Sequence, residues 1–218
     1  MRPTAIAVFA HPDDESFGPA GTLAHLSKTH DIYLLIATDG GAGYCSVEKH
    51  EEKLSDIRKR ELNAASEILG IKEVFFLGFA DGSLCNNEYH NIARHIEGKL
   101  KEYRPEIVIT YEHHGISGHL DHIAISFITT FVVKNLHFKP ELWYYHILQE
   151  EYEAIGKNYF VHFPQGIKKE QAEKIVDISD VWEARVAALH AHASQKHDGD
   201  KIIKILQNLP KEEYFTLL

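Results

Sequence analysis

The segment His11-Pro12-Asp13-Asp14-Glu15 places one imidazole and three carboxylates directly after the apolar run 5–10. Such a run predicts a buried strand, and in open α/β sheets the residues that follow a strand form ligand sites. His11 and Asp14 offer one nitrogen and one oxygen donor, which suits zinc and other divalent first-row metals. Asp13 would then remain available for proton transfer. Spacing alone does not decide which of the two aspartates binds the metal.

A second cluster, His119-Leu120-Asp121-His122, follows another apolar run at 107–111. Because parallel strands end at one sheet edge, we expect this cluster to meet His11 there, although His122 lies 111 residues further along the chain (122 minus 11). His113 and His114 are rival ligands. His122 is the better candidate, since it sits at an expected helix start beside an aspartate. Three protein ligands would leave a fourth position open, which is typical of catalytic zinc.

Structural explanations compete for each of these residues. Aspartates at a helix N-terminus accept backbone N–H bonds and suit the helix dipole. Capping accounts for one carboxylate of the first motif but not for three. A lone histidine is usually structural, whereas two histidine clusters after two strands favour a metal site.

The composition is that of a globular protein. The 218 residues suffice for one core and no linker-like stretch divides them, so we expect a single domain over 1–218. A net charge of -9 with dispersed basic residues argues against a nucleic-acid partner. The first apolar run is too short for a signal peptide or a membrane span, so we expect a cytoplasmic protein. Cys45 and Cys85 form no C-x-x-C pair, which argues against a thiolate metal site.

Apolar runs that alternate with helix-like patterns define the expected elements. Alternation of this kind predicts parallel β-α-β units, and continuously apolar strands predict helices on both faces of the sheet. We expect an α/β fold, a Rossmann-like three-layer sandwich with a mostly parallel sheet and a small C-terminal β/α extension. The expected strands are 4–10, 32–38, 73–77, 107–111 and 142–148, and the expected helices are 54–69, 88–103 and 120–135.

The C-terminal extension is less regular. Segments 159–163 and 174–178 are expected as strands that form a small antiparallel pair. Ser179 and Asp180 are expected helix caps before a helix at 181–195, and a shorter helix is expected at 201–209.

Two familiar site types are excluded by the residues present. Pro12 stands where a dinucleotide-binding loop needs glycines and N–H donors, and the acidic residues beside it would repel a pyrophosphate. No G-x-x-x-x-G-K-[ST] loop occurs. His50-Glu51 lacks the second histidine of an H-E-x-x-H protease, because Leu54 occupies that position.

Several blocks of the chain, taken in order, resemble the LmbE-like, or PIG-L, family of zinc-dependent deacetylases. The first motif is the most specific, and the similarity spans most of the chain. The blocks are His11 to Glu15, Gly21-Thr22-Leu23, Thr38-Asp39-Gly40, Arg60-Glu61 through Leu69-Gly70, Phe76-Leu77-Gly78, Asp81-Gly82, His119 to His122, Ala191-His192 and Ser194-Gln195.

The resemblance implies a role for each site residue. The zinc ligands would be His11, Asp14 and His122. Asp13 would be the general base, and protonated His119 would stabilise the tetrahedral intermediate. Asp121 would lie behind a histidine and fix its tautomer or charge.

Two further positions, Arg60 and Asp81, match residues that approach the sugar in relatives. Each also has an ordinary explanation, because Arg60 can pair with a helix carboxylate such as Glu61 and Asp81 can form a turn before Gly82. Three departures concern the pocket rim rather than the metal ligands: Gly41, Leu120 and Ala193 differ from residues common in relatives.

The reaction implied by the resemblance is removal of the N-acetyl group from an N-acetylglucosamine-type amino sugar or its conjugate. The resemblance also implies self-association. Two alternatives stay open: an amidase that acts on another N-acylated small molecule, and a non-catalytic metal-binding module.

Overall fold

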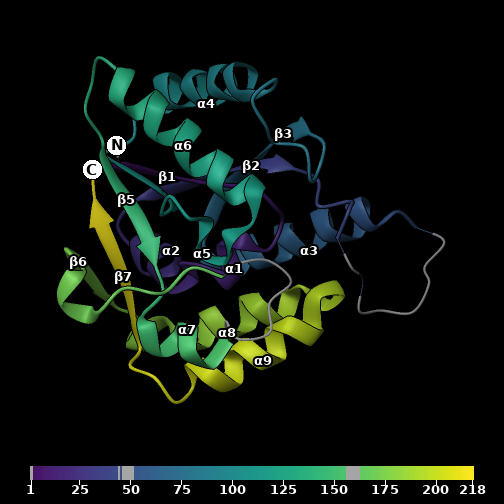
Figure 1. Ribbon diagram of the computed structural model, residues 1–218, viewed down its shortest axis with the longest axis vertical. Helices are drawn as coiled ribbons and strands as arrows, with labels where there is room; N and C mark the ends of the chain where they lie inside the picture. Colours follow the sequence, from purple (N-terminus) through teal and green to yellow (C-terminus); the bar gives the residue numbers. More distant parts are fainter. Residues whose placement is uncertain (1, 44, 46–51, 156–162) are drawn as a thin grey trace.

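The computed structural model describes residues 2–43, 45, 52–155 and 163–218 and contains a seven-stranded sheet (Figure 1). The strand order is β3-β2-β1-β4-β5-β7-β6. The first five strands in this order are parallel, and β7 runs antiparallel to both of its neighbours. The strands are β1 (Thr4–Phe9), β2 (Asp31–Thr38), β3 (Ile71–Phe79), β4 (Ile107–Tyr111), β5 (Glu141–His146), β6 (Lys174–Asp177) and β7 (Glu212–Leu217).

Helices cover both faces of the sheet, as the continuously apolar strands predict (Figure 1). One hydrophobic core joins the sheet to α2, α3 and α8, and a second joins it to α4 and α6. The predicted three-layer α/β fold is therefore confirmed. Within the described ranges, no helix is both long and apolar enough to cross a bilayer. The helices are α1 (Asp14–Phe17), α2 (Ala20–Leu26), α3 (Leu54–Leu69), α4 (Tyr89–Tyr103), α5 (Gly115–Gly118), α6 (Leu120–Asn135), α7 (Gln149–Ile155), α8 (Trp182–Ala191) and α9 (Lys196–Leu206).

The central strand β1 explains why the first site segment is rigid. Its residues alternate between the two cores: Ala7 and Phe9 face one, and Ile6 and Val8 face the other. All four are at most 1% exposed. Parallel pairing aligns β1 with β4, so the residues after Phe9 and those after Tyr111 leave the sheet at the same edge.

The C-terminal third differs from its prediction. The expected strand 174–178 is present as β6, but it pairs with β7, which was not predicted. Most of the expected strand 159–163 lies outside the described residues. The helix expected at 181–195 ends at Ala191, where a 3-10 turn (Ala193–Gln195) follows, and the last helix begins earlier than expected, at Lys196. Ser179 and Asp180 lie in a 3-10 turn before α8 rather than at its cap.

Strand β7 carries a buried carboxylate that ties distant elements together. Glu213 is 1% exposed and accepts the backbone N–H groups of Gly21 and Thr22, at 2.9 and 2.7 Å. It also pairs with Arg185 of α8. A charged residue inside a short strand breaks the apolar pattern by which strands are recognised, which explains why this strand was missed.

Candidate active site

The turn after β1 is held by its own aspartate. The Asp14 carboxylate accepts the backbone N–H groups of Ala10 at 3.0 Å and His11 at 2.8 Å. Asp14 is 4% exposed, and it also begins α1. The carboxylate is thereby folded back over the strand end, beside the His11 ring.

The second segment is held by short-range contacts at the start of α6. His119 caps this helix: its Nδ1 accepts the N–H of Asp121 at 3.2 Å. One turn along, His122 donates through Nδ1 to the carbonyl oxygen of Gly115 at 3.0 Å. Gly115 has φ +67°, and a Cβ on it would lie 2.6 Å from the Cβ of His122. Only glycine accommodates both this backbone conformation and this close approach.

The structure brings the two segments together. His11 Nδ1 lies 3.1 Å from His122 Nε2, although 111 residues separate the two histidines in sequence. Asp14 completes the group, with one carboxylate oxygen 3.2 Å from His122 Nε2 and the other 3.7 Å from His11 Nδ1. His119 stands close by, its ring centroid 4.8 Å from that of His11 and 5.0 Å from that of His122.

The partners of the two histidines define their tautomers. His11 Nε2 faces an oxygen of Asp81 at 3.1 Å and one of Asp121 at 3.2 Å. Carboxylate and carbonyl oxygens only accept, so hydrogen resides on His11 Nε2 and, toward Gly115, on His122 Nδ1. The two remaining nitrogens therefore point their lone pairs at each other. Such an approach requires a shared cation, either a proton or a metal ion.

These donors fit a divalent metal. In a tetrahedral zinc site with bonds near 2.0–2.1 Å, ligand atoms lie about 3.4 Å apart. The separations of 3.1, 3.2 and 3.7 Å among His11, His122 and Asp14 bracket that value. Among the described residues, the groups that could hold an ion are His11, His119 and His122 on one side of His11, and His11, Asp81 and Asp121 on the other. The second group is better suited to orienting the His11 ring than to binding an ion, because Asp121 already accepts two backbone N–H groups and Asp81 accepts one.

The pKa shifts of His11 and Asp14 agree with an ion site on one side of His11 and orienting carboxylates on the other. Burial alone would lower the pKa of His11, but its hydrogen bonds to Asp121, Asp14 and Asp81 raise it well above the usual value. Burial would raise the pKa of Asp14, yet His122 and His11 hold it well below its usual range. These shifts favour a positive charge between the His11 ring and the Asp14 carboxylate, which a proton or a metal ion can supply.

Asp13 has an unusual backbone and a raised pKa. Its φ of 126° costs a residue other than glycine about 1–3 kcal/mol, so the surroundings must hold it there. Its carboxylate, 15% exposed, lies 2.8 Å from Arg58 Nη2. Burial raises its pKa to about 6, with Arg58 opposing the rise and Asp14 adding to it. Such a group can take up and release a proton near neutral pH.

The arginine that reaches this site is Arg58, not Arg60. Arg58 is 4% exposed and donates to the carbonyl oxygens of Pro12 and Gly40 at 2.5 and 3.0 Å. The Arg60 side chain is 63% exposed and pairs with Glu52. Two positions along a helix correspond to a rotation of about 200°, so the two side chains leave opposite faces of α3. The structure thus places Arg60 away from the cavity, and substrate contact by Arg60 remains a prediction; Arg58, which sequence reasoning missed, lines the cavity.

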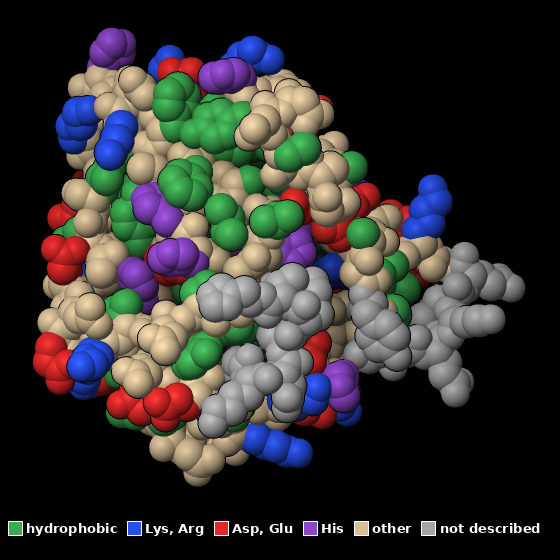
Figure 2. Space-filling model, viewed as in Figure 1, with side chains coloured by type: hydrophobic (Ala, Val, Ile, Leu, Met, Phe, Trp, Pro, Cys, Tyr) green, Lys and Arg blue, Asp and Glu red, His purple; other side chains and the backbone are tan. Residues whose placement is uncertain are grey.

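The rival histidines lie elsewhere. His113 stacks on Phe127 with ring centroids 4.6 Å apart and contacts the Ser126 hydroxyl at 3.0 Å. His114 is exposed and pairs with Glu112 at 2.9 Å. Figure 2 shows histidine side chains among hydrophobic ones on the face that carries α6.

A cavity of about 570 Å³ is lined by His11, Asp13, Asp14, His119 and His122, whereas Asp121 does not line it. Asp81 also lines the cavity, with its carboxylate facing His11 and Ala42. Much of the remaining lining is apolar or aromatic, and it includes Phe17, Tyr111, Ile116, Tyr145, Ile147, Phe163 and Leu206. A volume of this size is typical of a small-molecule site.

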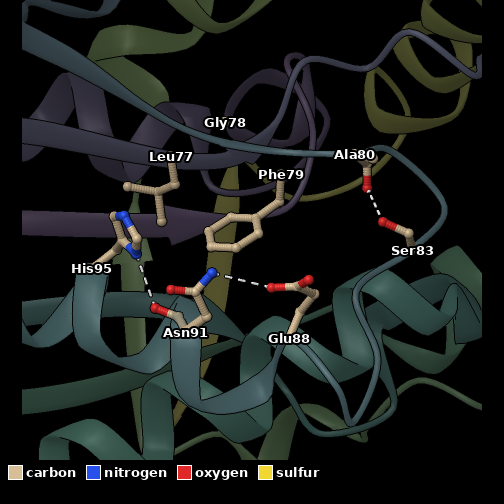
Figure 3. Close-up of a pocket in the computed structure, with 8 residues that line it drawn as sticks. All are labelled: Leu77, Gly78, Phe79, Ala80, Ser83, Glu88, Asn91 and His95. Atoms are coloured by element: carbon tan, nitrogen blue, oxygen red, sulfur yellow. Dashed lines mark hydrogen bonds between the residues drawn. The ribbon is translucent and has the colours of Figure 1, made fainter.

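A second hollow, of about 380 Å³, lies where β3 meets α4 (Figure 3). Its polar groups bond to one another: the Asn91 side chain donates to Glu88 at 3.2 Å, and the Asn91 backbone carbonyl oxygen lies 2.9 Å from His95 Nδ1. None of the predicted site residues lines it. The chemistry therefore belongs to the larger cavity.

Comparison with known proteins agrees with this geometry. The family profile described as "PIG-L: GlcNAc-PI de-N-acetylase" matches residues 6–133. The chain is 31% identical to a probable N-acetyl-alpha-D-glucosaminyl L-malate deacetylase 2 of Bacillus cereus, over 89% of this chain and 84% of that one. It is 27% identical to a 1D-myo-inositol 2-acetamido-2-deoxy-alpha-D-glucopyranoside deacetylase of Mycobacterium sp. (strain JLS), over 89% and 75%.

Solved structures share the fold. The N,N'-diacetylchitobiose deacetylase of Pyrococcus horikoshii superposes with a TM-score of 0.72 at 19% identity, covering 100% of this chain and 84% of that one. GalB, a 4-carboxy-2-hydroxymuconate hydratase of Pseudomonas putida, superposes with a TM-score of 0.75 at 18% identity, covering 99% and 96%. Since a hydratase and a deacetylase share this architecture, the fold alone does not select the reaction.

Proposed function

Because this chain belongs to the GlcNAc-PI de-N-acetylase (PIG-L) family of N-deacetylases, we propose that it removes the N-acetyl group from an N-acetylglucosamine conjugate by metal-assisted hydrolysis. The observation that carries the proposal is the convergence of three donors, on His11, Asp14 and His122, beside the separate carboxylate of Asp13. A structural metal site needs no such spare carboxylate.

The three converging residues would hold a divalent ion such as zinc. When bound, the ion supplies Lewis acidity, which polarises the amide carbonyl and acidifies water. Asp121 and Asp81 receive the Nε2–H of His11 and so keep its Nδ1 directed toward the ion site. In the same way, the Gly115 carbonyl keeps Nε2 of His122 directed inward.

Asp13 carries the proton transfers. With a pKa of about 6 it is mostly anionic at pH 7, so it can take a proton from the water that attacks the amide carbon. The new C–O bond forms as this proton moves to Asp13. When the C–N bond then breaks, the same proton passes to the leaving nitrogen, which gives acetate and a free amine.

His119 acts on the oxygen of the amide. Its Nδ1 accepts the N–H of Asp121, so the neutral ring carries hydrogen on Nε2 and can donate it to the developing oxyanion. Burial, followed by the nearby His11 and His122, lowers the pKa of His119. We therefore assign this role to the neutral ring, in place of the protonated form expected from sequence.

The substrate class rests on the relatives and on the cavity. Both relatives are named for deacetylation of N-acetylglucosamine joined to a second polar group. A cavity of about 570 Å³ leaves room for such a conjugate, with its acetamide at the His11 end.

The test is acetate release by protein loaded separately with zinc, Mn²⁺ or Co²⁺. The panel contains N-acetylglucosamine, its malate and inositol conjugates, N-acetylated amino acids and an N-acetylated nucleoside. We expect hydrolysis of a glucosamine conjugate that Asp13→Asn abolishes without loss of bound metal. Turnover confined to the other acyl amines would instead establish an amidase of different specificity. Stoichiometric metal without turnover of any acyl amine would favour a non-catalytic module.

A further inference from the structure

A buried Glu15–His192 pair lies directly behind Asp13. Glu15 and His192 are both 0% exposed, and Glu15 Oε1 lies 2.7 Å from His192 Nε2 across 177 residues of sequence. Burying such a pair is weak evidence for stabilisation, because the desolvation cost offsets the attraction. The pair is therefore better explained by what it holds in place than by its contribution to stability.

The other carboxylate oxygen of Glu15 accepts a hydrogen bond from the backbone of Asp13. Oε2 accepts the Asp13 N–H at 3.1 Å, while Oε1 also accepts the Ser16 hydroxyl at 2.6 Å. This is the residue whose φ of 126° must be held from outside. Arg58 holds the other end of Asp13, at its carboxylate. Asp13 is thus fixed through both its backbone and its side chain.

The imidazole of His192 is itself firmly anchored. His192 directly follows the last residue of α8. The next turn is bonded to α3, because Glu61 accepts both the N–H and the hydroxyl of Ser194, at 2.7 and 2.6 Å. The second nitrogen of His192, Nδ1, is buried and has no hydrogen-bond partner among the residues that the structure describes. A residue present only for packing would not leave a polar atom unpaired, so the contact with Glu15 is the reason for an imidazole here.

We propose that Glu15 and His192 are positioning residues that hold the Asp13 backbone in its strained conformation and thereby aim its carboxylate into the cavity. The role rests on the proposed function of Asp13 as the base. Neither residue lines the cavity, so neither is a catalytic residue.

The test replaces the Nε2–H donor while keeping the fold. His192→Phe preserves a planar ring but removes the donor, whereas His192→Gln restores an N–H at a similar reach. We expect His192→Phe to lower kcat at least about tenfold, since displacement of a catalytic group by about 1 Å costs up to about a hundredfold, and to change KM less than about twofold. His192→Gln should recover most of kcat. His190→Phe is the matched control, because His190 lies two positions earlier, in the last turn of α8, and its side chain is exposed.

A second readout needs no activity. In the wild-type protein the Asp13 amide is bonded to Glu15, so its hydrogen exchange should be slow, and His192→Phe should accelerate it at least about tenfold. Unchanged kcat and unchanged exchange in His192→Phe would overturn the proposal. Equal losses in the Phe and Gln variants, accompanied by equal losses of thermal stability, would also overturn it, because the pair would then only pack. If the wild type hydrolyses no acyl amine, the proposed function fails, and the exchange comparison still decides the positioning role.

Discussion

Replacing Arg58 with methionine should move the pH dependence of catalysis. The guanidinium lies 2.8 Å from the Asp13 carboxylate and opposes the rise of its pKa. For two charges about 4 Å apart in a protein environment the attraction is about 4 kcal/mol, or about three pKa units at most. Because the charge is delocalised and shared with two carbonyl oxygens, we expect a shift of about one to two units. The pKa of Asp13 should therefore rise from about 6 to about 7–8.

The direction of the activity change follows from the role of Asp13. A general base works as the anion, so activity lies above its pKa and the acid limb of the profile should move to higher pH. With a pKa of about 6, roughly nine tenths of Asp13 is ionised at pH 7; with a pKa of about 7–8, roughly a half to a tenth is. We expect kcat/KM at pH 7 to fall about two- to tenfold through this effect and to recover near pH 9.

The assay is kcat/KM for acetate release between pH 5 and 9. Arg60→Leu is the matched control, because Arg60 lies two positions along α3 and pairs at the surface with Glu52. An acid limb that stays in place in Arg58→Met, or moves to lower pH, would refute the assignment of Asp13 as a base tuned by Arg58. A loss of kcat/KM in Arg60→Leu would instead indicate that Arg60 contacts the substrate.

Three further predictions concern the ion site and the base. Asp13→Asn should lower kcat about 10²- to 10⁴-fold while the metal-to-protein ratio, measured by elemental analysis, stays at the wild-type value; wild-type turnover would remove Asp13 from the mechanism. Asp121→Ala should weaken metal affinity about 10- to 100-fold in chelator competition, because His11 loses a partner that orients its ring. Unchanged affinity would show that Asp81 alone orients the His11 ring. Metal uptake should release a proton at pH 7, since the carboxylates around His11 raise its pKa and a ligand must be deprotonated to bind, and affinity should therefore increase as pH rises through that pKa. Titration calorimetry in buffers of different ionisation enthalpy measures this release, and its absence would contradict the protonated state.

The convergence of the two motifs was predictable because it depends on strands. The segments 5–10 and 107–111 are continuously apolar, and parallel neighbours must end together, so whatever follows them meets at one edge. The tautomers of His11 and His122 were not predictable, because they depend on which oxygen faces the far side of each ring.

Other features depend on three-dimensional packing that no local pattern records. The choice between Arg58 and Arg60 depends on how α3 is rotated against the sheet, and the charged stretch around both residues leaves that rotation ambiguous. The contact between Glu15 and His192 spans 177 residues, so neither residue signals the other along the chain. Both cases involve charged or polar groups in buried positions, where hydrophobic periodicity gives no guidance.

The Glu213 carboxylate has a consequence for the order in which the protein is completed on the ribosome. The backbone amides that it accepts, at Gly21 and Thr22, are synthesised 192 and 191 residues before it. At about 5–20 residues per second, α2 emerges roughly 10–40 s before its acceptor exists. Strand β5 ends at His146 and its partner β7 begins at Glu212, 66 residues later (212 minus 146). At the same rate the β5 edge stays unpaired for roughly 3–13 s, and chaperones that recognise unpaired strands have that shorter interval in which to act.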